Sequence, residues 1–372
     1  MLNPQKFLKA IRNHGVEFST GVPDSLLKDF CSVITDEGSD IIAANEGGAI
    51  ALGMGHHLAT GKIPLVYMQN SGFGNCVNPL TSLADPDVYS IPMLLMIGWR
   101  GEPGVKDEPQ HVKQGRISEE LLQTMGIDYA ILSGNEEEAA NQLAEAFDSM
   151  KSKNAPFALL VRKGVFEKYK LQTKVENPYT IIREEVIEWM LKGMEEEAVV
   201  VSTTGKSSRE VFEIRAKNQM GHGKDFLTVG GMGHASQIAL GISLSKKNRP
   251  VYCLDGDGAT IMHMGAGAII GNQPSGNYKH ILINNGCHES VGGQATVGFA
   301  IDFQKIANAS GYKHTWLVEE MDQLPAIWDQ FQKAEGPVLL EVRTTESSRA
   351  DLGRPTTTPI QNKEAFMKNL SN

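Results

Sequence analysis

The sequence lacks several features that would set the chain apart from ordinary globular proteins. None of its apolar runs is long enough to span a bilayer, and it contains no block of Lys and Arg residues. These absences argue against a membrane or a nucleic acid as a partner. The four cysteines have no C-x-x-C spacing, so we expect reduced, buried thiols and a cytoplasmic location. They are Cys31, Cys76, Cys253 and Cys287.

The composition is that of a soluble enzyme-sized protein. The 372 residues suffice for about two or three domains, and the net charge of −9 means that any anionic ligand needs locally placed cations. The 38 glycines suit a fold with many tight turns between strands and helices. Residues 1–15 read as an amphipathic helix rather than a signal peptide.

Short apolar runs alternate with helical patterns through both halves of the chain. Continuous apolar strands separated by helices are typical of an α/β fold, in which helices cover both faces of a parallel sheet. The expected strands of the first half are 16–21, 40–45, 63–69, 91–98, 129–134 and 157–164. Those of the second half are 198–205, 226–231, 250–258, 280–286, 315–320 and 337–344.

Each half opens with the same helix, strand and turn, so we expect two similar domains. The predicted boundaries are residues 1–165 and 180–372, joined by a polar linker at 166–179. Ligands of parallel α/β sheets bind beyond the carboxyl ends of the strands. The residues that close each apolar run are therefore the candidates for function.

Two strand ends of the second half stand out, LDGDGAT at 254–260 and INNGCHES at 283–290. The 25 residues 259–283 leave room for one helix and one strand, so the two loops should lie side by side. Asp257, Asn285 and a nearby carbonyl are oxygen donors of the kind that suits Mg²⁺ beside a phosphate group. Read separately, the first segment could be a turn and the second a simple loop.

The paired segments resemble the thiamine-diphosphate signature of the superfamily of decarboxylases and acetohydroxyacid synthases. The resemblance implies that Mg²⁺ is bound by Asp257, Asn285 and the carbonyl oxygen of Cys287, and that the metal grips the diphosphate of the cofactor. The other cofactor-binding residues implied for this loop are Gly256, Gly258 and Ala259.

The segment VGGMGHASQIALG at 229–241 is similar to the stretch that supports the cofactor's pyrimidine in this superfamily. The resemblance implies cofactor contacts from Gly230 and Gly231. It places Met232 where a bulky apolar residue keeps the cofactor bent. The alternative is a glycine-rich strand end with a methionine in the core.

A lone carboxylate, Glu46, stands at the start of the small-residue helix NEGGAIALGMGHHLATG at 45–61. The superfamily has a catalytic glutamate at this place, which hydrogen-bonds N1′ of the pyrimidine and assists formation of the thiazolium ylide. A carboxylate favoured by the helix dipole is the alternative interpretation of Glu46 by itself.

The chain is too short for the central third domain of the larger superfamily members. It resembles the compact family of phosphonopyruvate and sulfopyruvate decarboxylases over nearly its whole length. The matching segments are 21–30, 45–61, 66–83, 97–111, 203–210 and 347–355. Fusion of both halves in one chain favours the phosphonate branch.

The resemblance implies decarboxylation of 3-phosphonopyruvate to phosphonoacetaldehyde and CO₂ in the biosynthesis of phosphonates such as 2-aminoethylphosphonate. It also implies a homo-oligomer, at least a dimer, with active sites between chains. His288 is a further candidate for substrate protonation or binding. Glu210 is a weaker candidate near the cofactor, with a helix salt bridge as the alternative.

An acidic protein must place cations beside such a substrate, and polar loop residues provide them. Each charged candidate could instead be a solvated surface residue, and Arg100 is preferred because polar and glycine residues surround it. The candidate cations are Arg100, Lys106, His111, Arg349 and Arg354, and Ser25 and Asn70 are candidates to donate hydrogen bonds to the substrate.

Four other functions fit parts of the pattern. They are sulfopyruvate decarboxylation, carboligation as in acetohydroxyacid synthases, non-catalytic cofactor binding and dehydrogenation. A cofactor binder would not need Glu46. A dinucleotide site is disfavoured because the glycine-rich segment 72–77 ends in Val77, and the next strand is followed by Arg100 rather than an acidic residue.

Overall fold

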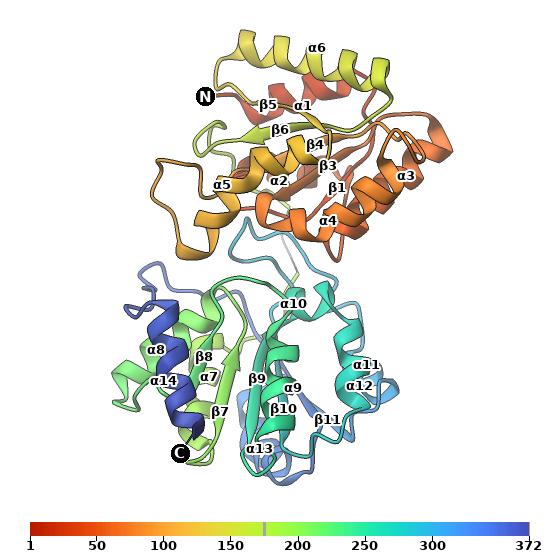
Figure 1. Cartoon of the computed structure of the whole chain (residues 1–372). Helices are drawn as coiled ribbons and strands as arrows, with labels where there is room; N and C mark the ends of the chain where they lie inside the picture. The colour runs from red at the N-terminus through yellow and green to blue at the C-terminus, as the bar shows by residue number, and fades with distance from the viewer. Residues whose placement is uncertain (174–175, 372) are drawn as a thin grey trace. The chain divides into compact units, whose positions relative to one another are not determined.

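The structure, a computed structural model, describes residues 1–173 and 176–371. Residues 174 and 175 of the expected linker lie outside the described residues. The chain divides into two compact units, Met1–Val175 with His288–Gln294, and Glu176–Cys287 with Ala295–Asn372. Each unit is an α/β sandwich built on its own sheet (Figure 1).

The first sheet has six parallel strands in the order β2-β1-β3-β4-β6-β5. Short apolar runs form these strands, and their residues alternate between the two buried faces. Leu65 and Tyr67 pack on one face and Val66 and Met68 on the other. The strands are β1 Ser19–Gly21, β2 Asp40–Ile42, β3 Leu65–Gln69, β4 Leu94–Gly98, β5 Asp128–Ile131 and β6 Phe157–Val161.

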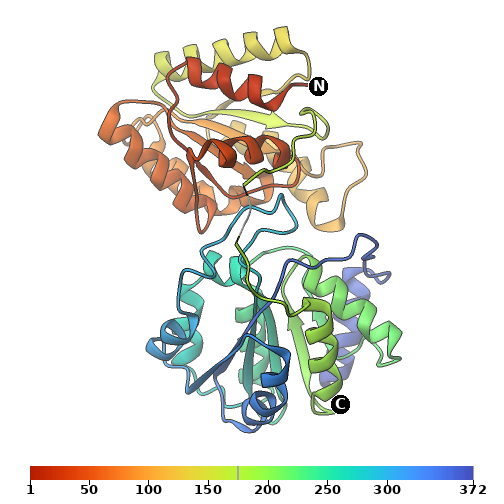
Figure 2. The same ribbon diagram turned by 180° about the vertical axis from the view of Figure 1, so that it is seen from behind.

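Helices cover both faces of the first sheet. Core residues of α1, α2 and α6 share one face, and those of α3, α4 and α5 share the other. Helices α1 and α6 lie next to each other in both views (Figures 1 and 2). The helices are α1 Pro4–Asn13, α2 Lys28–Glu37, α3 Glu46–Thr60, α4 Phe73–Pro79, α5 Pro109–Thr124 and α6 Glu136–Lys153, with short turns η1 Asn70–Gly72 and η2 Leu80–Ala84.

The second sheet also has six parallel strands, in the order β11-β12-β10-β9-β7-β8. Read from β8, this order repeats that of the first sheet strand for strand. The strands are β7 Val199–Ser202, β8 Asp225–Leu227, β9 Val251–Gly256, β10 Tyr278–Asn284, β11 His314–Val318 and β12 Val338–Arg343.

Helices α7, α8 and α13 bury apolar residues on one face of this sheet, and α9, α11, α12 and α14 on the other. The helices are α7 Arg183–Gly193, α8 Lys206–Lys217, α9 Ala235–Ser245, α10 Asp257–Met262, α11 Gly265–Gly271, α12 Phe303–Ala309, α13 Leu324–Lys333 and α14 Pro359–Ser371, with the short turn η3 Met321–Gln323. The expected fold class is therefore confirmed. Within the described residues it consists of two similar parallel-sheet α/β domains, with no third domain between them in the sequence.

The sheets place the candidate residues at the carboxyl ends of their strands, as parallel α/β folds do. Ser25, Glu46, Asn70 and Arg100 follow β1, β2, β3 and β4. In the second unit, the glycine-rich segment 229–234, Asp257 and Asn285 follow β8, β9 and β10. Within the described residues, no helix combines the length and the apolar character needed to cross a membrane.

Candidate active site

The carboxyl group of Glu46 is buried and held by residues that follow β3. Its Oε2 accepts a 2.7 Å hydrogen bond from Nδ2 of Asn75. A Cβ built on Gly72 would lie 2.5 Å from Cγ of Glu46, so glycine is needed for the close approach. Glu46 begins α3, where the helix dipole favours a negative charge. The first unit thus holds a carboxyl group in one orientation with only 6% of the residue exposed.

Asp257 stands where β9 passes directly into α10, and it is also buried. Its carboxylate accepts hydrogen bonds from the hydroxyl of Thr296 and from the backbone N–H groups of Gly258 and Asn285. Burial raises the pKa of Asp257 to about 6, although these hydrogen bonds act to lower the pKa. A nearby cation would therefore strongly stabilise the ionised form of the Asp257 carboxyl group.

The two asparagines at the end of β10, Asn284 in the strand and Asn285 after it, have different contacts. Asn284 donates from Nδ2 to the carbonyl of Gly298 and to Oε1 of Glu341, both at 2.8 Å, and so ties the loop to the sheet. Asn285 lies in the loop, where its Oδ1 accepts a 3.2 Å hydrogen bond from the N–H of Cys287. Asn284 is fully buried in the strand, whereas Asn285 lies beyond it and is 7% exposed, so Asn285 is the better placed of the two to present its amide oxygen to a ligand.

The strand register brings the two loops together. Ile283 pairs with Gly256 across β10 and β9, so Asp257 and Asn285 both follow directly at one sheet edge. A Cβ on Gly298 would lie 2.6 Å from Oδ2 of Asp257, so this glycine lets the chain approach the carboxylate. The loop offers carboxylate, amide and carbonyl oxygens, a donor set that fits a hard divalent cation.

The glycine-rich segment after β8 forms a tight turn before α9. Gly231 has a φ of +66°, and Nδ1 of His234 lies 3.1 Å from its carbonyl oxygen. A Cβ on Gly233 would lie 2.9 Å from the carbonyl oxygen of Ala259, so this turn packs closely on α10. Gly230 and the half-buried Met232 belong to the same turn.

Three of the predicted substrate residues meet at the end of β4. Arg100 donates from Nη1 to Oγ of Ser25 at 2.8 Å and from Nε to Oδ2 of Asp107 at 2.8 Å, while its Nη2 also contacts Asp107. Asn70 donates from Nδ2 to the carbonyl of Arg100 at 2.8 Å and accepts from its N–H at 3.2 Å. The hydrogen bonds with Asp107 raise the pKa of Arg100. The cation is therefore fixed in position and permanently charged.

The surroundings of Arg100 contain further groups. Asp24 is fully buried, and its Oδ2 accepts the N–H of Leu26 at 2.9 Å. A Cβ on Gly98 would lie 1.9 Å from this oxygen, so glycine is required there. Burial and the charge of Arg100 lower the pKa of His111 to about 4, so this imidazole is neutral near pH 7. Lys106 is exposed in the same loop.

The remaining candidates have other surroundings. His288 belongs to a tight loop in which its N–H donates to the carbonyl of Gln294 at 2.8 Å. Arg349 forms ion pairs with Glu184, Glu213 and Asp351, and Arg354 is exposed. Glu210 is buried in a bidentate pair with Arg183, with both N–O distances at 2.8 Å.

Sequence reasoning missed the residues that hold the candidates in place. They are Asn75 beside Glu46, Thr296 beside Asp257, and Asp107 beside Arg100. Asn75 lies in α4, within the segment 66–83 that resembles the family. Its place in the turn and helix that follow β3 is the signal that could identify it.

Two known domain families match the chain. The thiamine pyrophosphate enzyme N-terminal TPP binding domain matches residues 5–124, and the C-terminal TPP binding domain matches residues 203–342. Both sheets and both groups of strand-end residues fall largely within these ranges. The fold and the site therefore define a thiamine diphosphate-dependent enzyme.

Similarity to curated proteins extends over nearly the whole chain. A phosphonopyruvate decarboxylase of Streptomyces viridochromogenes is 32% identical, with coverage of 98% of this chain and 94% of the relative. One of Streptomyces hygroscopicus is 31% identical, with 98% and 93% coverage. A sulfopyruvate decarboxylase of Methanosarcina acetivorans is 24% identical, with 89% of each covered. The chain belongs to the phosphonopyruvate decarboxylase family.

Proposed function

We propose that this enzyme decarboxylates 3-phosphonopyruvate to phosphonoacetaldehyde and CO₂, as a step of phosphonate biosynthesis. The bond between the carboxylate carbon and the keto carbon breaks, CO₂ leaves, and a proton takes its place on the carbonyl carbon. The observation that carries the proposal is the similarity to phosphonopyruvate decarboxylases across both domains, at 32% identity over 98% of the chain.

The second domain, residues 180–372, is proposed to bind the diphosphate end of thiamine diphosphate through Mg²⁺. Asp257, Asn285 and the carbonyl oxygen of Cys287 would bind the metal, and Gly256, Gly258 and Ala259 would surround it. When bound, thiamine diphosphate would supply a nucleophilic carbon and a cationic ring that can take up the electrons left by CO₂.

The first domain, residues 1–165, is proposed to act on the pyrimidine end of the cofactor, with the linker 166–179 joining the two domains. Glu46 would hold a proton at a ring nitrogen, and its orientation is set by Asn75 and Gly72. Gly230, Gly231 and Met232 of the other domain would support the cofactor's shape. His288 would bind the substrate or protonate the product carbon.

The substrate's anionic groups are proposed to bind near Arg100, with Ser25 and Asn70 as hydrogen-bond donors. The guanidinium is already oriented by Asp107, so little side-chain entropy is lost on binding. Lys106 lies in the loop after Arg100, and His111 lies on α5, which follows that loop. These two residues complete the set of proposed substrate-binding residues. Arg349 and Arg354 stay in the proposal as weaker members. Within the described residues, three carboxylates neutralise Arg349, whereas one, that of Asp107, pairs with Arg100.

We also propose a homo-oligomer, at least a dimer, in the cytoplasm, with each active site between two chains. Helices α3 and α4 expose Leu52, Leu58 and Val77, which an intersubunit contact would cover. Reduced buried cysteines suit that compartment. Sedimentation velocity tests the assembly, and a monomeric active enzyme would contradict it.

A CO₂-release assay tests the activity, with phosphonopyruvate, sulfopyruvate and pyruvate offered separately, with and without thiamine diphosphate and Mg²⁺. We expect cofactor-dependent release, with phosphonopyruvate giving the highest kcat/KM. Sulfopyruvate decarboxylation is the second candidate because of the Methanosarcina relative. A higher kcat/KM for sulfopyruvate would favour that activity, and no release from any of the three would overturn the proposal.

A further inference from the structure

We propose a second metal site, formed by Cys253, Asp255 and His280, that binds a divalent cation of borderline softness such as Zn²⁺. The site lies on the face of the second sheet that α9, α11 and α12 cover, apart from the loop that carries Asp257 and Asn285. It does not depend on the proposed substrate.

The strands place the three side chains together. Cys253 and Asp255 are two residues apart on β9, so their side chains leave the sheet on the same face. His280 of β10 is the register partner of Cys253. The thiol sulfur, a carboxylate oxygen and an imidazole nitrogen all lie within 4.8 Å of one another. Two adjacent strands therefore present three different ligand types to one point.

The separation between two of the ligands fits a metal better than a direct contact. His280 Nε2 and Asp255 Oδ2 are 3.6 Å apart, which is too long for a hydrogen bond between them. Two such ligands on a tetrahedral zinc ion would be separated by about 3.4 Å, given Zn–N and Zn–O bonds of about 2.0–2.2 Å. The pair is thus already spaced as ligands of one ion.

The outer atoms of Asp255 and His280 are engaged and their inner atoms are not, while the Cys253 thiol is hydrogen-bonded with Tyr278. Asp255 Oδ1 accepts the N–H of Gly256 at 3.0 Å, and His280 Nδ1 lies 3.0 Å from the hydroxyl of Tyr312. Asp255 Oδ2 and His280 Nε2 have no hydrogen-bond partner among the described residues. Leaving such groups unsatisfied at exposures of 1% and 4% is costly, and a bound cation would satisfy both.

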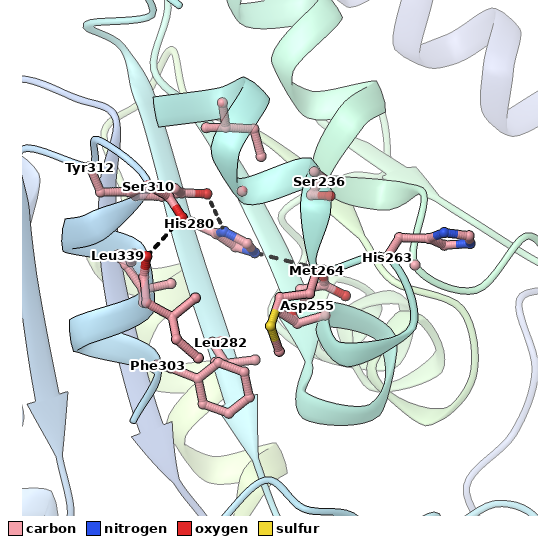
Figure 3. Close-up of a pocket in the computed structure, with 17 residues that line it drawn as sticks. Ser236, Asp255, His263, Met264, His280, Leu282, Phe303, Ser310, Tyr312 and Leu339 are labelled. Atoms are coloured by element: carbon pink, nitrogen blue, oxygen red, sulfur yellow. Dashed lines mark hydrogen bonds and ion pairs between the residues drawn. The ribbon is translucent and has the colours of Figure 1, made fainter. Parts of the chain in front are cut away.

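Tyr312 acts as the outer partner that metal-binding histidines commonly have. When Nδ1–H of His280 is donated to the Tyr312 hydroxyl, the lone pair of Nε2 faces Asp255. Figure 3 shows the His280 ring between Tyr312 and Asp255. Thr260 Oγ1 lines the same space and has no partner in the described part of the chain.

A cavity lies beside two of the three proposed ligands, Asp255 and His280. Its volume is about 40 Å³, and its lining includes Ser236, Thr260 and Ser310 together with apolar residues such as Phe303 (Figure 3). A single water needs roughly 10–15 Å³, so an ion with a water as its fourth ligand fits. The donor set of sulfur, nitrogen and oxygen selects zinc over magnesium, which prefers oxygen alone.

The site would brace the cofactor-binding edge. Asp255 precedes Asp257 by two residues, and His280 lies on the strand that leads to Asn285. A metal joining β9 to β10 would hold both strand ends in register. Because all three ligands are buried, we expect the ion to be retained on purification.

The test measures metal in the full-length protein, purified with Mg²⁺ and thiamine diphosphate. We expect about one zinc per chain by mass spectrometry, and close to none in Cys253→Ser or His280→Asn variants that retain the far-ultraviolet circular dichroism of the parent. Cys31→Ser is the matched control, since Cys31 is equally buried in the other domain. It should keep the metal.

Protein grown with Co²⁺ gives a second readout that does not use activity. We expect a sulfur-to-cobalt charge-transfer band that Cys253→Ser abolishes and Asp257→Asn keeps. A parent without zinc and without this band would overturn the proposal and leave a water-bridged Asp–His pair. A band lost in Asp257→Asn but kept in Cys253→Ser would also overturn it, because the metal would then belong to the other loop.

Discussion

Asn75 donates a 2.7 Å hydrogen bond to Oε2 of Glu46, although the two residues lie on different helices. The amide holds one of the two carboxyl oxygens. This contact gives the carboxyl group a single orientation. Replacement of Glu46, or of Gly72 beside its carboxyl group, tests the proton-holding role proposed for Glu46.

Glu46→Gln should keep the fold and the affinity for thiamine diphosphate but lose turnover. The glutamine fills the same space yet cannot exchange a proton, and general acid–base groups contribute roughly 10²–10⁴-fold. Steady-state kcat, together with cofactor titration by near-ultraviolet circular dichroism, measures both properties. Unchanged kcat would remove Glu46 from the proposed role.

Gly72→Ala should lower kcat by up to about 100-fold, since small displacements of a reacting group carry penalties of that size. The added Cβ would lie 2.5 Å from Cγ of Glu46 and push the carboxyl group aside. Gly74→Ala is the matched control, because a Cβ at Gly74 meets nothing within 4 Å. Equal activities of the two variants would show that the position of the carboxyl group is unimportant.

Mg²⁺ binding should weaken in acid. Burial raises the pKa of Asp257 to about 6 in the metal-free protein, and the metal binds only the carboxylate. Protons therefore compete with the metal below that pKa, and the half-saturating Mg²⁺ concentration should rise about tenfold per pH unit. Well above the pKa of Asp257, the half-saturating Mg²⁺ concentration should be constant. This concentration can be measured at several pH values by following cofactor binding with fluorescence.

Two results would contradict this acid weakening. The first is a half-saturating concentration that does not change between about pH 5 and pH 7, because the carboxylate would then have an ordinary pKa. The second is an Asp257→Asn variant that binds Mg²⁺ and thiamine diphosphate as tightly as the parent does.

Arg100→Ala should raise the KM for phosphonopyruvate by about 10–100-fold, the range expected when hydrogen bonds to a charged group are lost. The KM for pyruvate, which has no phosphonate, should rise less. Arg116→Ala, an exposed arginine on α5, serves as the control. An equal rise for both substrates would place Arg100 away from the phosphonate.

Glu210→Gln should destabilise the protein rather than weaken cofactor binding. Glu210 and Arg183 form a buried pair, with 1% and 5% of their side chains exposed, and removing one charge leaves the other uncompensated. The expected loss in the free energy of unfolding is about 3–5 kcal/mol, measured by urea denaturation. Unchanged stability with a higher requirement for thiamine diphosphate would instead support a role at the cofactor.

The sequence was most informative where an element is defined by its own residues. Each expected strand of both sheets is present, because continuous apolar runs flanked by glycines leave few alternatives. The lengths were less accurate. The run 16–21 is a strand only at Ser19–Gly21, since β1 pairs with its neighbours over three residues.

The contacts around the site could be predicted only in part. The neighbouring positions of Asp257 and Asn285 followed from two strand ends and the spacing between them. The ion pair between Arg100 and Asp107 could not be predicted from the sequence. Asp107 lies across a loop whose path depends on Gly101 and Gly115 packing against each other. Such contacts depend on the three-dimensional path of a loop, which no local pattern encodes.

The shared strand order of the two sheets points to the duplication of a single ancestral half. Strands β3 and β9 occupy equivalent places in that order. After β3 the chain supplies the neighbours of Glu46, and after β9 it supplies Asp257. On the proposed function, these equivalent strand ends would have diverged, one toward positioning the carboxyl group of Glu46 and the other toward metal binding by Asp257. Descendants of such an ancestor need both copies, whether they are encoded by one gene or by two.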